Sequence, residues 1–204
     1  MVWVVEYSTI FAQRGLPLVT TATTPASQTH TTWQIDPAHS LVEFSVRHMM
    51  VSTVKGRFTG VSGTIVDNGE DPTLSSVQVE IDPASITTSD PKRDGHLRSP
   101  DFFDVEQYPT ITFKSTRIQG TRDEFKLIGD LTIRDQTREV ALDVTLNGIG
   151  TSPYGQTVAG FSGQTRLNRR DFGLNWNAAL ESGGVLVSDQ FKLEVEIEAV
   201  KQAA

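Results

Sequence analysis

Alternation of apolar and polar residues dominates the chain from residue 33 onward. The clearest case is residues 191–198, where phenylalanine, leucine, valine and isoleucine alternate with lysine and glutamate. Successive side chains of a strand point to opposite faces, so this period of two predicts strands with one apolar and one polar face. The same pattern predicts seven further strands, at residues 42–48, 55–66, 77–82, 111–114, 126–134, 139–146 and 158–168.

The turns between these segments indicate how the strands are arranged. Most are short, such as Asp67-Asn68-Gly69, which favours antiparallel neighbours. Two packed sheets and a closed barrel would both bury one face of every strand, but segments of about ten residues exceed the usual length of about five or six. We therefore expect an all-β fold, an eight-stranded antiparallel barrel about 25 to 30 Å tall.

One segment between the third and fourth predicted strands has a helical signature. Asp90 is a good N-cap residue, and Pro91 suits the first turn of a helix. A helix this short is not stable in isolation, so we expect Leu97, Phe102 and Phe103 to pack it against the barrel. Residues 171–184 lack alternation and predict a long loop at one barrel end, of the kind that often forms a lid.

The first 31 residues differ from the rest of the chain. Residues 20–32 are rich in threonine, alanine, proline and serine, and the apolar stretch before Arg14 lacks the preceding positive charge of a secretory signal. We expect a flexible tail over residues 1–31 and one barrel domain over residues 32–204. The same pattern favours a cytoplasmic over a secreted protein.

The composition of the chain excludes several classes of function. A net charge of -7 and a pI near 5.1 give nucleic acids no basic surface to bind. The absence of cysteine excludes disulfides and thiol catalysis. No apolar run approaches the roughly 18 residues of a membrane-spanning helix, and the histidines are too scattered to predict a metal site.

Several ordered sequence blocks then identify a resemblance. They run from residue 33 to residue 174 and include Trp33-Gln34-Ile35-Asp36-Pro37-Ala38-His39-Ser40, Gly56-Arg57-Phe58, Arg93-Asp94-Gly95-His96-Leu97-Arg98-Ser99-Pro100 and Arg169-Arg170-Asp171-Phe172-Gly173-Leu174. In these blocks the chain resembles the YceI-like family. One departure is Asp135-Gln136-Thr137, where the family usually has Gly-Val-Thr. Asp costs more than Gly at positive φ, which puts the geometry of this turn in question.

The resemblance implies a lipocalin-like barrel that encloses a polyisoprenoid chain of quinone or prenyl-phosphate type. It implies no catalytic residues and no catalytic cofactor, only a bound polyisoprenoid lipid. The expected partner is thus an apolar small molecule. The sequence leaves the oligomeric state open, including a homodimer.

The strand phases predict which residues face such a ligand. Small inward residues, Gly129, Ala159 and Gly163, would leave a slot beside the inward aromatic rings. The residues expected to bind the ligand are Val42, Phe44, Val46, His48, Phe113, Gly129, Leu131, Ile133, Phe161, Phe172 and Trp176.

Polar residues leave alternatives open. Arg93, His96 and Arg98 either contact a head group at the entrance or have a structural role, because Asp94 and Arg98 are spaced for an ion pair. His48 is either a head-group contact or a core histidine. An enzyme that uses His48, or Asp94 with His96, as acid and base is a second hypothesis. A filled barrel that serves only as an interaction domain is a third.

Overall fold

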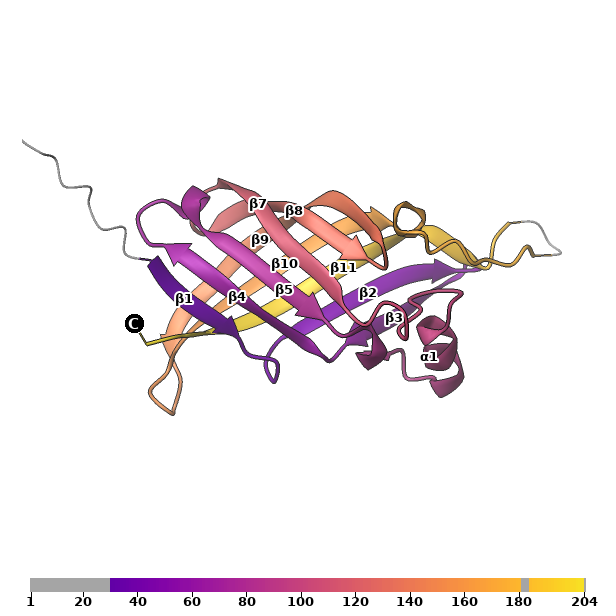
Figure 1. Cartoon of the computed structure of the whole chain (residues 1–204), viewed down its shortest axis with the longest axis horizontal. Helices are drawn as coiled ribbons and strands as arrows, with labels where there is room; N and C mark the ends of the chain where they lie inside the picture. Colours follow the sequence, from indigo (N-terminus) through magenta and orange to yellow (C-terminus); the bar gives the residue numbers. More distant parts are fainter. Residues whose placement is uncertain (1–29, 181–183, 204) are drawn as a thin grey trace, which may run out of the picture.

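In its described part the chain folds into a closed antiparallel β-barrel with one short α-helix (Figure 1). A computed structural model describes residues 30–180 and 184–203. The strands are β1 (His30–Ile35), β2 (Leu41–His48), β3 (Ser52–Phe58), β4 (Val61–Asn68), β5 (Ser76–Ile81), β6 (Ile86–Thr87), β7 (Ile111–Gly120), β8 (Glu124–Ile133), β9 (Gln136–Thr151), β10 (Thr157–Asn168) and β11 (Val187–Lys201). The helix is α1 (Pro91–Arg98), and three short 3-10 turns are η1 (Pro72–Leu74), η2 (Pro83–Ser85) and η3 (Arg169–Phe172).

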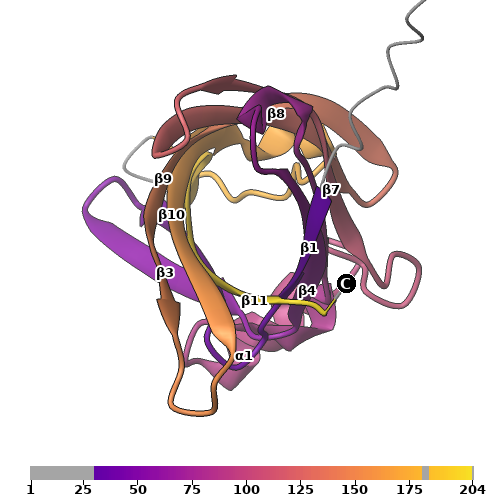
Figure 2. The same ribbon diagram turned by 90° about the vertical axis from the view of Figure 1, so that its left-hand side faces the viewer.

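The barrel closes where the first and last strands meet. The sheet runs in the order β1-β4-β5-β7-β8-β9-β10-β11, and β11 pairs back onto β1 with Trp33 opposite Lys201. Figure 2 shows the resulting ring from the end that holds the start of β1 and the C-terminus. The predicted eight-stranded antiparallel barrel is therefore confirmed.

Three of the eight strands are bent and each counts as two elements. Both β1 and β2 pair with β11, and β3 and β6 continue the positions of β4 and β5. At the bend of the second strand, the Gly60 N–H donates to Ser85 Oγ at 2.9 Å, and the Asp82 N–H donates to the Gly60 carbonyl at 2.8 Å. A Cβ on Gly60 would lie 2.9 Å from Asp82 Cβ. Glycine is thus required for this close approach between neighbouring bends.

The helix α1 follows β6 and precedes β7, as predicted. The Asp90 carboxylate accepts hydrogen bonds from the N–H groups of Lys92 and Arg93, which confirms the expected N-cap. β6 pairs only with β3 among the described strands, so no ladder joins it to β7. The helix lies beside β3 near one end of the barrel (Figure 1), and Leu97 and Phe103 pack against the core.

Two details differ from the sequence expectations. β1 begins at His30, inside the segment that we expected to be a tail, whereas residues 1–29 lie outside the described part of the chain. In the turn between β8 and β9, Arg134 takes the left-handed conformation with φ of 57°, and Asp135 does not. The departure from the family's Gly-Val-Thr therefore puts no aspartate at positive φ.

Candidate functional site

Apolar space lies along the barrel axis in two adjoining sections. The larger section encloses about 1310 Å³ of space between atoms, including its open mouth. Its wall comes from the inward faces of all eight strand positions, so side chains far apart in the sequence meet around one axis. The β10–β11 ladder runs from Val158 to Asn168, and at about 3.3 Å per residue and a tilt near 40° it gives a barrel height of about 28 Å.

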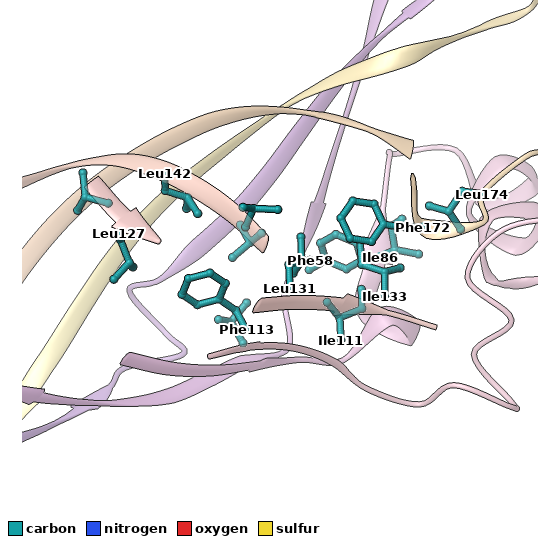
Figure 3. Close-up of a cluster of buried hydrophobic side chains, with 14 of the residues drawn as sticks. Phe58, Ile86, Ile111, Phe113, Leu127, Leu131, Ile133, Leu142, Phe172 and Leu174 are labelled. Atoms are coloured by element: carbon teal, nitrogen blue, oxygen red, sulfur yellow. The ribbon is translucent and has the colours of Figure 1, made fainter. Parts of the chain in front are cut away.

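The smaller section lies toward α1 and encloses about 800 Å³. Both sections share four lining residues, which mark the junction between them: Val42, Ile81, Leu131 and Leu193. Figure 3 shows Leu131 between Phe113 and Leu127 on one side and Phe58, Ile133 and Phe172 on the other. These side chains are buried from solvent but leave space along the axis.

Two glycines in the barrel wall make room for aromatic rings, which can then lie close to the wall and leave the axis open. A Cβ on Gly56 would lie 2.3 Å from Phe44 Cζ, and one on Gly129 would lie 2.7 Å from Phe113 Cζ and 2.4 Å from the Lys114 carbonyl oxygen. The rings therefore occupy the space that a side chain at each glycine would need. Because each ring lies against the wall, it does not block the cavity. The sequence suggested that Gly129 itself leaves a slot in the barrel. Instead, the absence of a side chain at Gly129 makes room for the ring of Phe113.

Most of the predicted ligand-binding residues line the cavity. Phe113 and Phe161 line the larger section, Phe44, Val46 and Ile133 line the smaller one, and Val42 and Leu131 line both. Strand alternation predicted these residues because residues two positions apart on a strand point to the same face, here the inward one.

Four predicted residues lie elsewhere, among the lining residues of neither section: His48, Gly129, Phe172 and Trp176. His48 is the last residue of β2, at the edge of the barrel wall. Phe172 is 1% exposed and belongs to the packed core. Trp176 packs against His96 and Phe102, with ring centroids 4.6 and 5.5 Å apart. Phe172 and Trp176 lie in η3 and in the loop after it, whose positions alternation does not describe, whereas Gly129 lies within β8 and has no side chain to reach the cavity.

The three basic residues of α1 that the sequence predicted as head-group contacts have partners within the protein. Arg93 donates from Nε to Thr88 Oγ1 at 2.7 Å, and Arg98 donates from Nε to the Ala84 carbonyl at 2.8 Å. His96 Nε2 lies 2.8 Å from Asp101 Oδ2. None of these three basic side chains lines either section, so the structure does not place them as head-group contacts.

Asp94 also has a structural environment. Its carboxylate accepts hydrogen bonds from the Thr88 N–H and hydroxyl, and it is 6% exposed. Burial acts to raise the pKa of Asp94, but the hydrogen bonds from Thr88 and Thr87 and the charge of Arg98 together outweigh it and hold the pKa below its ordinary value. The ion pair that we expected between Asp94 and Arg98 is not among the contacts, because Arg98 points to the carbonyls of Ala84 and Ile86.

Arg169 closes the α1 end of the cavity. It lines the smaller section, is 4% exposed, and donates to the carbonyls of Leu174, Trp176 and Ser188 and to the Asp189 carboxylate. Burial acts to lower the pKa of Arg169, and the charge of Asp189 opposes it. These bonds fix the start of the loop after η3 at this end of the barrel, where the sequence predicted a lid.

The polar residues of the larger section were missed by the sequence analysis. Asp67, Ser75 and Arg122 line it beside almost exclusively apolar side chains. Arg122 Nη2 lies 3.0 Å from Asp67 Oδ2, although the two residues are 55 positions apart. The only available signal was the phase of Asp67, which falls on the inward face with Ile65.

A second polar cluster lies outside the cavity, where β1 ends. His39 Nδ1 lies 2.9 Å from Asp36 Oδ2 and 3.7 Å from Glu198 Oε1, and the His39 side chain is 65% exposed. The hydrogen bond to Asp36 raises the pKa of His39 and lowers that of Asp36. The ligand-type atoms of the three residues lie within 4.8 Å of one another. Because Glu198 is remote in sequence, histidine spacing alone did not reveal this group.

Comparison with known proteins agrees with the architecture. Residues 33–199 match the YceI-like domain. The chain belongs to the YceI-like family. A UPF0312 protein of Staphylococcus epidermidis is 38% identical over 169 residues, which cover 82% of this YceI-like chain and 96% of the relative. The sequence resemblance is therefore confirmed.

Solved structures share the fold of this YceI-like domain. The Campylobacter jejuni YCEI protein is 28% identical, has a TM-score of 0.66, and is matched over 77% of this chain and 90% of its own. BcnA of Burkholderia cenocepacia gives a TM-score of 0.70 at 23% identity, over 80% and 98% of the two chains. A polyisoprenoid binding domain from Saccharophagus degradans gives 0.62 at 14% identity, over 83% and 98%. Within residues 30–180 and 184–203, no helix has the length and apolar character to cross a membrane.

Proposed function

We propose that this protein binds and carries a long apolar lipid, of polyisoprenoid type, inside its barrel and without covalent chemistry. The observation that carries the proposal is the axial cavity, whose two apolar sections meet at Val42 and Leu131. Such a narrow space suits a linear chain better than a compact substrate. The structural likeness to a domain named as polyisoprenoid-binding supports the same ligand class.

Burial alone provides enough free energy for such binding. At about 0.8 kcal/mol per CH₂-sized group, a five-carbon isoprenoid unit gains about 4 kcal/mol when it leaves water. Binding costs about 4 to 15 kcal/mol in lost translational and rotational freedom. A chain of several units therefore binds tightly, whereas a single unit does not.

The two other hypotheses have less support. The enzyme hypothesis relied on His48 or on Asp94 with His96, yet these residues lie outside the lining, and Asp94 is bonded to Thr88. An interaction domain with a filled barrel would have no axial space, whereas the larger section extends from the open mouth to Leu131.

Native mass spectrometry of the gently purified protein tests the proposal. We expect adducts whose mass, after organic extraction, corresponds to a polyisoprenoid lipid that is chemically unchanged. Delipidated protein should take up an added prenyl lipid with one-to-one stoichiometry. A protein that remains without ligand in both experiments would contradict the proposal, and turnover lost in His48→Ala would favour the enzyme.

A further inference from the structure

The larger section has polar side chains at one end only. Asp67 ends the inward face of β4, Ser75 precedes β5, and Arg122 lies in the turn between β7 and β8. Among the described lining residues, these are the only ones with charged or hydroxyl side chains. The end of β4 and the turn between β7 and β8 lie at the end of the barrel opposite α1 (Figures 1 and 2). A ligand in this section therefore meets hydrogen-bonding groups at the mouth. At the α1 end the ligand meets the Arg169 guanidinium, which already donates to three backbone carbonyls and the Asp189 carboxylate.

These side chains form a connected group. Arg122 donates from Nη2 to Asp67 Oδ2 at 3.0 Å and from Nη1 to the Gly69 carbonyl at 3.1 Å. Ser75 Oγ lies 3.5 Å from Asp67 Oδ1 and accepts the Asn68 N–H at 2.9 Å. The pairing is needed because an inward carboxylate beside apolar walls is costly without a partner.

The group can still contact a ligand. The Arg122 side chain is 43% exposed and that of Asp67 is 21% exposed, so the pair lies at the mouth and not in the core. A guanidinium has five N–H donors, and the two bonds described above leave donors for a ligand oxygen. Few polar groups in an otherwise apolar pocket commonly fix the orientation of a ligand.

The charge at this mouth discriminates among head groups. In the described turns and strand ends at this mouth, carboxylates outnumber basic side chains. The acidic residues are Asp67, Glu70, Asp71, Asp123 and Glu124, and the basic residues are Arg122 and Lys201. A diphosphate would lie beside the Asp67 carboxylate and would compete with it for Arg122. Like charges at such short range disfavour binding, whereas a carbonyl oxygen can accept from Arg122 with the ion pair intact.

We propose that the mouth formed by Asp67, Ser75 and Arg122 holds the head of the bound lipid and selects an uncharged, carbonyl-bearing head of quinone type over a diphosphate. This inference rests on the proposed lipid-binding function. It adds the orientation of the ligand, with its head at the Asp67–Arg122 mouth and its tail toward α1. Asp67 sets the selectivity, and Arg122 supplies the hydrogen bond.

The test compares three ligands that share one geranylgeranyl chain: a naphthoquinone, the alcohol and the diphosphate. Each is titrated into delipidated protein by competition against one fluorescent fatty probe. We expect the wild type to bind the quinone about tenfold or more tightly than the diphosphate, a difference of about 1.4 kcal/mol or more. In Asp67→Asn the diphosphate should gain affinity and the ratio should approach one.

Two further variants complete the test. Arg122→Gln should weaken the quinone more than the alcohol, because a carbonyl oxygen only accepts hydrogen bonds whereas the hydroxyl of the alcohol can also donate to the Asp67 carboxylate. Arg117→Gln is the matched control, because the Arg117 side chain is 51% exposed, close to the 43% of Arg122, and pairs with Glu139 at 3.3 Å, while neither Arg117 nor Glu139 lines the cavity. This control should keep the wild-type selectivity.

The outcomes separate the two proposals. Tight binding of all three ligands without discrimination, a preference for the diphosphate, or wild-type selectivity in Asp67→Asn would overturn the head-group assignment and leave lipid binding standing. If none of the three displaces the probe from the wild type, the proposed binding of a polyisoprenoid lipid is itself refuted.

Discussion

Leu131→Trp tests whether the two sections form one continuous site. Leu131 is 6% exposed and lines both sections, so a larger side chain there enters the junction. Tryptophan has about six more heavy atoms than leucine and displaces about as many carbon groups of a threaded chain, a loss of about 5 kcal/mol at about 0.8 kcal/mol per group. Part of this loss is recovered if the chain shifts. We therefore expect affinity to fall by at least about a hundredfold.

The assay is titration of a geranylgeranyl lipid by native mass spectrometry, with thermal unfolding measured in parallel. Asp130→Trp is the matched control, since Asp130 is the adjacent residue of β8 and its side chain is exposed on the outer face. The control should bind like the wild type. Overpacking costs about 1 to 3 kcal/mol, which a folded barrel tolerates. Wild-type affinity in a folded Leu131→Trp protein would show that the chain does not pass the junction, and the account of one axial site would be wrong.

Three further predictions concern stability, each measured by urea unfolding. Asp94→Asn should lower the free energy of unfolding by about 2 kcal/mol at neutral pH. Because the pKa of Asp94 in the folded protein lies below its ordinary 3.8, this difference from the wild type should vanish as the pH falls through the lowered pKa. A difference that stays constant with pH would contradict the role of Asp94 as a hydrogen-bonded carboxylate. Gly129→Ala should lower the free energy of unfolding by about 1 to 3 kcal/mol, because the new Cβ would overlap a carbonyl oxygen. Gly150→Ala is the control and should be near neutral, because no atom lies within 4 Å of the Cβ position. Equal effects of the two substitutions would refute the packing argument. Arg169→Lys should cost about 2 kcal/mol or more and should speed hydrogen exchange in residues 173–178, since an ammonium cannot reproduce the guanidinium bonds; unchanged exchange would show that other contacts hold this segment.

Alternation located the lining because burial is decided residue by residue along a strand. Every second residue of 191–197 faces the barrel interior, and the structure places Leu193, Val195 and Ile197 on the larger section. The N-cap at Asp90 was equally local, since it depends on the next three residues. The predicted positions failed at Trp176, which lies in the loop after η3, and also within strands, where Gly129 has no side chain and His48 is the last residue of β2.

By itself the sequence determined the family, the faces of the strands and the apolar character of the interior, because these follow from periodicity and short-range spacing. Only the tertiary structure decided that the apolar space divides at Leu131, that aromatic rings lie over Gly56 and Gly129, and that Asp67 meets Arg122 at one mouth. These features depend on strand register and on contacts between distant segments. A shift of one residue in register would turn each of these side chains to the other face of the wall.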